Sequence, residues 1–161
     1  MSALRDPQSS PGVWIPPPLF YAVGFGLGLL LHRRWPVALA GPSWIEGREI
    51  AGVVSIFSAM ALLAWAVATC WRARTTIIPH QRASFLVRRG PYRWSRNPMY
   101  VGMTGLYLGM TLVLDSPWPL LFLPAVLLVI DRYVIHREES HLEARFGADY
   151  EAFRRGVRRW L

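Results

Sequence analysis

The residues of this chain that are most able to do chemistry form two short polar clusters. The first is the stretch LVRRGPYRWSRNPMYVG, residues 86–102, which combines arginines, aromatic residues and two proline-containing breaks. The second is residues 131–150, which contain the adjacent acids Glu138 and Glu139. No Ser/His or Cys/His pair indicates a nucleophile with its base. We therefore expect binding and positioning of a pre-activated group rather than covalent catalysis.

The first cluster is typical of a turn followed by a helix start. Gly90-Pro91 would turn the backbone sharply, so that its N–H groups could face a ligand, although a plain loop turn explains the same residues. Asn97 as N-cap and Pro98 as first helical residue would begin a helix, whose N-terminus can bind a carboxylate or phosphate. Tyr100 would face the same ligand or serve as an interfacial aromatic.

The second cluster follows the last long apolar segment. Glu138 and Glu139 come just after Arg132 and Arg137, which predicts either a salt-bridged helix face or a carboxylate that meets a cationic or amino-bearing ligand. Arg132 or Arg137 could hold an acidic acceptor. Asp131 lies closer to the apolar segment, so we expect it to pair with an arginine, because an unpaired charge there is expensive.

The elements that must position these clusters are apolar helices. Just over half of the 161 residues are apolar, and they gather in blocks long enough to cross a bilayer. We predict an all-α integral membrane protein with about four transmembrane helices, a C-terminal helical hairpin and an amphipathic C-terminal helix. The expected spans are residues 19–35, 50–71, 99–114 and 117–135. Residues 1–18 are expected to be a disordered or extended tail, and residues 19–161 a single domain.

The charge pattern predicts the orientation in the membrane. The formal charge is +8 and every basic residue is arginine. Seven arginines lie in residues 72–98 and seven after residue 130, against three between the first two spans, so both polar clusters are expected to face the cytoplasm. The hairpin between them would bring them together. We expect a protein of the bacterial inner (plasma) membrane that contacts membrane lipids.

Other kinds of site are disfavoured. In a membrane protein the basic balance indicates anionic headgroups, so we expect no nucleic-acid partner. The four histidines have neither cysteine partners nor zinc-like spacing, which predicts no metal site. Cys70 is the only cysteine, so an internal disulfide is ruled out.

The two clusters together resemble the isoprenylcysteine carboxyl methyltransferase family, which belongs with the phospholipid N-methyltransferases. LVRRGPYRWSRNPMYVG and then REESHLEARFGADYEAFRRGVRRW are similar to the family pattern LV..GPY...RHPMY.G, a hydrophobic hairpin and EE..L...FG..Y..Y, over residues 84–160. The resemblance implies S-adenosylmethionine as cofactor, bound on the cytoplasmic side. The implied cofactor-binding residues are Ser84, Phe85, Leu86, Val87, Tyr92, Asn97, Pro98, Met99, Tyr100 and Glu138.

The resemblance also implies a catalytic group and an acceptor. Asn97 stands where well-known members have histidine, so it keeps an amide hydrogen bond but cannot act as a base. Arg132 and Arg137 flank the position of an arginine that is associated with the prenylcysteine carboxylate in eukaryotic members. We take these three residues as the catalytic candidates. The expected acceptor is lipophilic: a prenylcysteine-like carboxylate, a lipid amine or a small lipophilic molecule. The acceptor atom and the oligomeric state stay open.

Two alternatives have the same fold class. Membrane sterol reductases share a related C-terminal hairpin and use NADPH, but they are much longer. A non-catalytic membrane adaptor would keep the fold without the reaction, and Asn97 in place of histidine favours that alternative.

Overall fold

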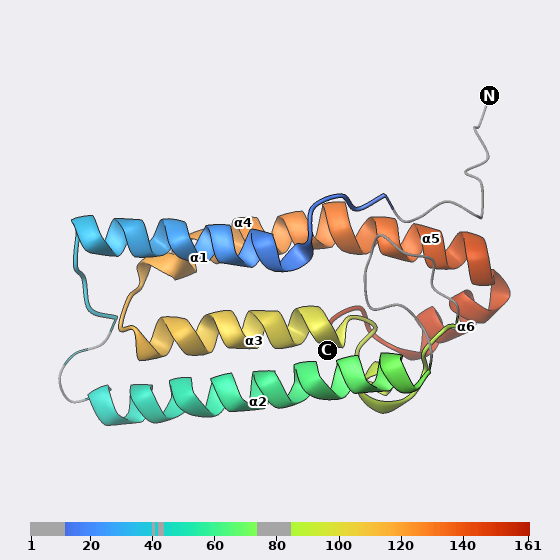
Figure 1. Cartoon of the computed structure of the whole chain (residues 1–161), viewed down its shortest axis with the longest axis horizontal. Helices are drawn as coiled ribbons and strands as arrows, with labels where there is room; N and C mark the ends of the chain where they lie inside the picture. The colour runs from blue at the N-terminus through green and yellow to red at the C-terminus, as the bar shows by residue number, and fades with distance from the viewer. Residues whose placement is uncertain (1–11, 40, 42–43, 74–84) are drawn as a thin grey trace.

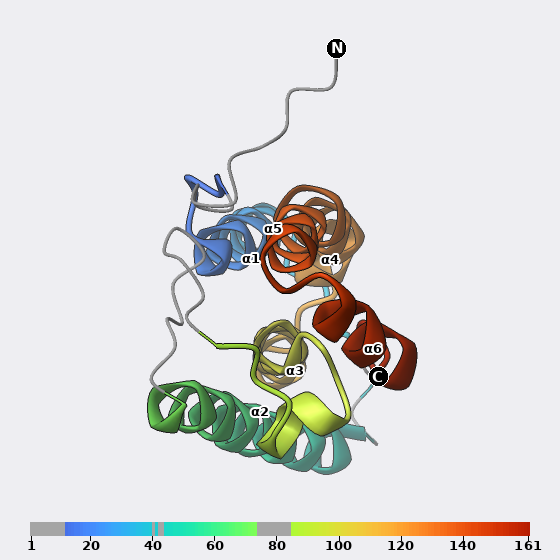
Figure 2. The same cartoon turned by 90° about the vertical axis from the view of Figure 1, so that its right-hand side faces the viewer.

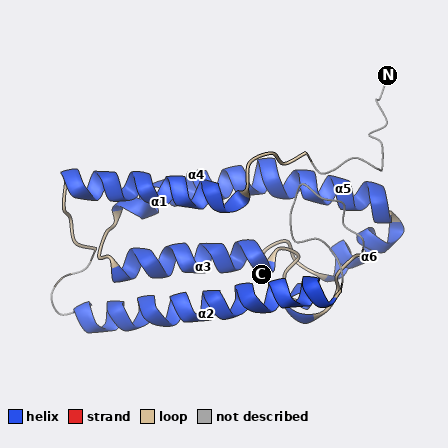
Figure 3. Ribbon diagram, viewed as in Figure 1, coloured by secondary structure: helices blue, strands red, loops and turns tan. Residues whose placement is uncertain are grey.

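Four long helices lie side by side in the computed structural model, which describes residues 12–39, 41, 44–73 and 85–161 (Figure 1). They are α1 (Pro17–Arg34), α2 (Ile45–Arg72), α3 (Pro98–Val113) and α4 (Trp118–Val129). Short helical turns and two further helices follow or link them: η2 (Gly90–Arg93), η3 (Ile130–Ile135), α5 (His136–Phe146) and α6 (Ala148–Gly156). The regular structure of the described residues is helical throughout (Figure 3), which confirms the all-α prediction.

The long helices pack as two pairs. α2 packs mainly against α3 and α1 mainly against α4, and few contacts join one pair to the other (Figure 2). The predicted hairpin of the third and fourth apolar segments is therefore correct in chain order but wrong in packing, because each of its helices contacts another partner more closely. Small residues allow one of these contacts: a Cβ added to Gly28 would lie 2.6 Å from the backbone of Pro119.

One continuous helix carries the second polar cluster. α4, the π-helical turn η3 and α5 run without a break from Trp118 to Phe146, so the fourth predicted span extends directly into the charged segment. Gly147 ends this helix with a φ of 49°, a conformation that disfavours residues with a side chain, and α6 then turns back (Figure 1). Gly147, the one glycine between the charged residues of 131–155, predicts an interruption of the helix, and the structure confirms it by dividing α5 from α6.

Two helices, Ile45–Arg72 and Trp118–Phe146, are long and apolar enough to cross a membrane. Exposed apolar side chains line the outer face of α2, and they include Ile50, Val54 and Phe57. α1 and α3 have 18 and 16 residues, which correspond to about 27 and 24 Å of helix against a hydrocarbon thickness of about 30 Å. A membrane protein is supported, while four spans remain a prediction.

The predicted N-terminal tail ends earlier than residue 18. α1 already begins at Pro17, and Val13 is fully buried against the core. Residues 1–11 lie outside the described part of the chain, so the prediction of disorder is not tested for them.

Candidate functional site

The structure brings the two polar clusters together at one end of the bundle. Tyr100, on the first turn of α3, donates a hydrogen bond of 2.8 Å from its hydroxyl to Oε1 of Glu138, on the first turn of α5. Tyr21 of α1 reaches the same place, because its hydroxyl lies 3.0 Å from Oγ1 of Thr104 and donates to the carbonyl of Tyr100 at 3.4 Å. Three helices from different parts of the chain therefore converge on the Tyr100–Glu138 pair.

Glu138 lies in the charged helix α5, beyond Ile135, where the apolar segment ends. No arginine of the described residues forms an ion pair with it, and the Tyr100 hydroxyl is its hydrogen-bond partner. The pKa of Glu138 is raised to about 7, chiefly because the carboxyl group is buried; the Tyr100 hydrogen bond lowers it in part, and the neighbouring charge of Glu139 adds a smaller rise. A cationic ligand would therefore be stabilised by this carboxylate and would favour its ionised form.

Glu139, the next residue, has the opposite surroundings. Arg96 Nη1 lies 3.1 Å from its Oε1, and Arg159 Nη2 lies 2.6 Å from its Oε2. The Glu139 and Arg96 side chains are only 10 and 9 % exposed. The interpretation as a salt-bridged helix face thus applies to Glu139, whereas the interpretation as a ligand-binding carboxylate fits Glu138.

Asn97 takes the predicted N-cap position of α3, and Pro98 is its first residue. The side chain, however, does not cap the helix: its Nδ2 donates to the carbonyl of Arg159 at 2.9 Å, while the Asn97 N–H donates to Ser95 Oγ at 3.0 Å. Asn97 therefore joins the start of α3 to the last residues of the chain.

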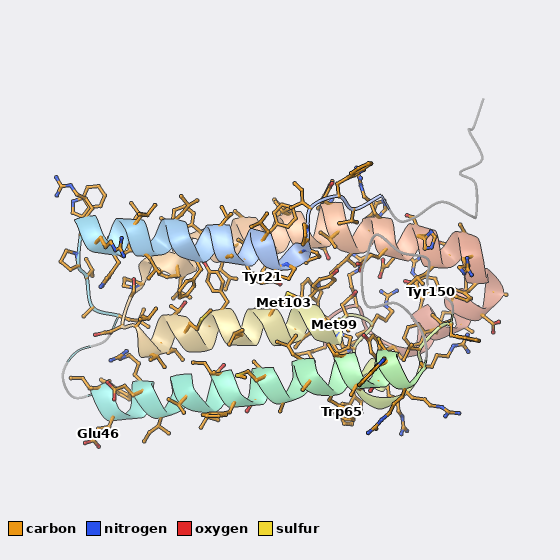
Figure 4. All side chains as sticks on the ribbon, viewed as in Figure 1. Tyr21, Glu46, Trp65, Met99, Met103 and Tyr150 are labelled. Atoms are coloured by element: carbon orange, nitrogen blue, oxygen red, sulfur yellow. The ribbon has the colours of Figure 1, made fainter. Side chains whose placement is uncertain are left out.

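The other candidate residues of the first cluster differ in burial and in their contacts. Tyr92 in η2 points its hydroxyl at Cys70 Sγ of α2, 3.1 Å away, and burial raises the Tyr92 pKa, followed by the electrostatic effects of Cys70 and Glu138. Leu86 and Val87 are half-buried just before η2. Of the other two candidates, Phe85 is exposed and Ser84 lies outside the described residues. Figure 4 shows Met99 and Met103 on the side of α3 that faces Tyr21.

Arg132 and Arg137 lie on another face of the long helix. Together with Tyr133, His136 and Ser140 they line a shallow, open hollow. Arg137 stacks 4.3 Å above the Tyr133 ring and donates from Nη1 to the carbonyl of Gly12 at 2.8 Å, whereas Arg132 is largely exposed, 3.8 Å from Asp131. The described contacts do not bring either arginine to Glu138, and their catalytic roles stay predictions.

Sequence reasoning missed the most strongly bound arginine of this end of the molecule. The arginines at the end of the amphipathic C-terminal segment are typical of a helix against an anionic leaflet, yet the Arg159 guanidinium contacts Asp131 at 3.2 Å in addition to Glu139. The prediction that Asp131 pairs with an arginine is confirmed. That prediction was the sequence feature from which an arginine facing the bundle could have been inferred. The Arg158-Arg159 repeat itself does not distinguish an inward arginine from an outward one.

Comparison with known proteins adds a family to this geometry. The model of a family described as phospholipid methyltransferase matches residues 48–149, which include the first polar cluster, the second up to its last residue but one, and all of α3 and α4. An uncharacterized protein of Haemophilus influenzae is 38% identical over 63 residues, which are 39% of this chain and the whole of that protein. No solved structure matches the chain.

Proposed function

The chain belongs to the phospholipid methyltransferase family, and from this premise we propose that it transfers a methyl group from S-adenosylmethionine to a lipophilic acceptor. Methyltransferase activity in general follows from the family. The cofactor, the acceptor and the residues are our proposal. The observation that carries it is the pairing of Tyr100 with Glu138, an acid without an arginine partner among the described residues.

The side chains around this pair fit the chemical groups of S-adenosylmethionine. Glu138 would accept hydrogen bonds from the amino group or the ribose, and the ring of Tyr92 or Tyr100 would face the sulfonium. The start of α3 would favour the carboxylate through the positive end of the helix dipole and the N–H of Met99, since the Asn97 and Tyr100 N–H groups already donate within this turn and Pro98 has none. Leu86 and Val87 are proposed to line the adenosine side, with Ser84 and Phe85 next to them. When bound there, the cofactor supplies an activated methyl group, whose displacement leaves a neutral thioether.

The protein's own contribution would be position and electrostatics. Tyr100 orients the Glu138 carboxylate, and Tyr21 with Thr104 fixes the backbone carbonyl of Tyr100. Asn97 would act by positioning α3, because an amide cannot take a proton as a base and its Nδ2 already donates to Arg159. No covalent intermediate with the protein is required.

The acceptor is proposed to reach this site from the membrane. Candidates are a lipid amine, a prenylcysteine-like carboxylate and a small lipophilic molecule. Arg132 and Arg137 would hold an acidic group of the acceptor in the hollow that they line with His136. This arrangement assumes four membrane spans and a site on the cytoplasmic face of a bacterial inner membrane, as the arginine distribution predicts.

Calorimetric titration of the purified full chain with S-adenosylmethionine tests this proposal. We expect binding by the natural chain and a loss of about tenfold or more in Glu138→Gln, since a charge-assisted contact is removed. Glu143→Gln is the matched control, because Glu143 lies in the same helix but pairs with Arg154 at 3.8 Å on the exposed side. NADPH is titrated in parallel.

The outcomes separate the three functions. Heat with S-adenosylmethionine alone supports the methyltransferase, and heat with NADPH alone would replace it by a reductase. Folded protein that binds neither ligand at saturating concentration would leave the non-catalytic adaptor and overturn the cofactor proposal. Mass spectrometry of lipid extracts after supply of labelled methionine then identifies the acceptor.

A further inference from the structure

The last described residues cross the start of α3 in an extended segment, Val157–Trp160, which we call the C-terminal strap (Figure 1). The backbone N–H of Arg96 donates to the carbonyl of Arg158 at 2.9 Å. One residue on, the Asn97 side chain donates to the carbonyl of Arg159 at 2.9 Å. The strap is thus attached to the residues that immediately precede α3.

The side chains of the strap reach a different element. Arg159 Nη2 lies 2.6 Å from Glu139 Oε2 in α5, and Arg159 Nη1 lies 3.2 Å from Asp131 Oδ1 in η3. Trp160 Nε1 donates to the same Asp131 oxygen at 3.3 Å. Arg159 therefore connects the start of α3, through its backbone carbonyl, with the long helix that bears Glu138, through its guanidinium.

Arg96, just before α3, forms a second ion pair with the same carboxylate, that of Glu139. Its Nη1 lies 3.1 Å from Glu139 Oε1, so two guanidinium groups share one carboxylate. Removing Glu139 would leave the nearly buried Arg96 guanidinium without its acidic partner, which is strongly unfavourable. The position of α5 relative to α3 is consequently fixed at Glu139, one residue from the carboxylate that accepts the Tyr100 hydrogen bond.

We propose that Arg159 is a positioning residue, which holds Glu139 and the start of α3 together so that Glu138 faces Tyr100 and is shielded from the charge of Glu139. What Glu138 binds rests on the proposed function, whereas its placement rests on the contacts above. The other arginines near this end of the chain differ: Arg154, Arg155 and Arg158 are exposed, and Arg154 forms only the half-exposed contact with Glu143.

The titration of Glu138 in the ligand-free protein tests this role. The full chain contains six glutamates, so ¹³C labelling of their carboxyl groups gives a small set of signals, and Glu138→Gln identifies the one that belongs to Glu138. Among the described residues, the groups that interact with this carboxylate are Tyr100 of α3, Tyr92 of η2 and Glu139 of α5. The variants alter the compensation of Glu139, and Arg159→Gln also removes one partner of Asp131.

Arg159→Gln removes one of the two positive charges on Glu139, so we expect the pH midpoint of Glu138 to rise by about 0.5 to 1 unit. Glu139→Gln removes the negative charge and leaves both arginines, so the midpoint should fall by a similar amount. Arg154→Gln, the matched control, should leave it unchanged. Arg159→Lys keeps the charge but loses the two-pronged contact, and we expect faster hydrogen exchange at the Arg96 amide with a small shift.

Two results would overturn the proposal. One is an unchanged Glu138 midpoint in both Arg159→Gln and Glu139→Gln, which would make the strap a structural anchor only. The other is unchanged exchange at the Arg96 amide in Arg159→Lys, a variant that tests the contact even where Arg159→Gln does not fold. The midpoints need no cofactor, so a natural chain that fails to bind S-adenosylmethionine overturns the proposed function while the Arg159 result still decides this inference.

Discussion

The two ends of the helix bundle hold partly buried charges in different ways. At the end formed by the loop between α1 and α2 and the turn between α3 and α4, Arg48 is nearly buried and donates to the carbonyls of Leu112 and Val113. Its Nε lies 3.4 Å from Asp115, which also accepts the N–H of Leu39 at 2.9 Å. At the other end, the hydrogen-bond donor to Glu138 within the described part of the chain is the Tyr100 hydroxyl.

The difference separates a structural charge from an available one. Arg48 compensates the free carbonyls at the C-terminal end of α3, where a cation is favourable, and its acidic partner is held by a second contact. The ionised Glu138 carboxylate is not compensated by a positive charge of the described residues. The neighbouring Glu139, by contrast, is compensated by two arginines. A cationic ligand would therefore compensate the charge of Glu138, whereas the charge of Arg48 is already compensated by the protein.

The largest effect is expected from breaking the structural end. Arg48→Met leaves Asp115 and two helix carbonyls without their partner, so the free energy of unfolding should fall by about 3 kcal/mol or more. Thermal unfolding in detergent, followed by helical circular dichroism, measures the loss. Arg34→Gln, an exposed arginine at the same end of the bundle, should change little. An unchanged Tm in Arg48→Met would remove the distinction between the two ends.

The available end should instead respond to pH. Because the pKa of Glu138 is raised to about 7, the carboxylate is ionised above that value and protonated below it. Binding of S-adenosylmethionine should therefore weaken as the pH falls below about 7, by up to about tenfold per pH unit. Calorimetry between pH 5.5 and 8.5 measures this, and Glu138→Gln should bind weakly with a flat profile. The same slope in Glu138→Gln would assign the titration to another group.

The two ends also differ in how well the sequence predicts them. Asn97-Pro98 correctly marks the start of α3, and the apolar runs locate every long helix. α2 begins at Ile45 rather than at residue 50, because its first polar turn lies before the apolar run that defines the predicted span. The capping-box pattern of Ser43-Trp44-Ile45-Glu46 does predict a helix start at this place. Hydropathy marks only the apolar part of a helix, so it does not predict where the helix ends when charged residues extend it.

Pairing across the bundle could not be predicted, because it depends on contacts between residues far apart in the chain. The acids at 138 and 139 are chemically identical in sequence, yet one faces Tyr100 and the other faces two arginines. Their separation follows from the 100° turn between successive helix positions and from the strap, whose arginines look like a membrane-facing tail. The family pattern places both acids in one motif, while the structure gives them different partners.

A moderate effect is expected from the hydroxyl that orients Glu138. Tyr100→Phe removes the 2.8 Å hydrogen bond and keeps the ring, so cofactor affinity should fall about five- to tenfold with little change in Tm. Tyr107→Phe is the matched control, since that hydroxyl donates to the Pro119 carbonyl at 2.7 Å in the middle of the bundle. It should lower the free energy of unfolding by about 1 kcal/mol and leave affinity unchanged. The reverse assignment of the two effects would place the ligand away from Tyr100.

The smallest effect is expected at Asn97. The direction of the change in Asn97→His distinguishes a catalytic base from a residue that only joins α3 to the C-terminal strap. The Asn97 Nδ2 donates to the Arg159 carbonyl, a contact that a histidine N–H can also make, so Asn97→His should bind cofactor within about threefold of the natural chain and add no titration near pH 6.5. Asn97→Ala loses the donor and leaves the carbonyl unpaired, so we expect faster hydrogen exchange at the Arg96 amide and about 1 kcal/mol less stability. Methyl transfer that rises tenfold or more in Asn97→His, with a new dependence on pH, would instead show that this position is a catalytic base that the natural chain lacks.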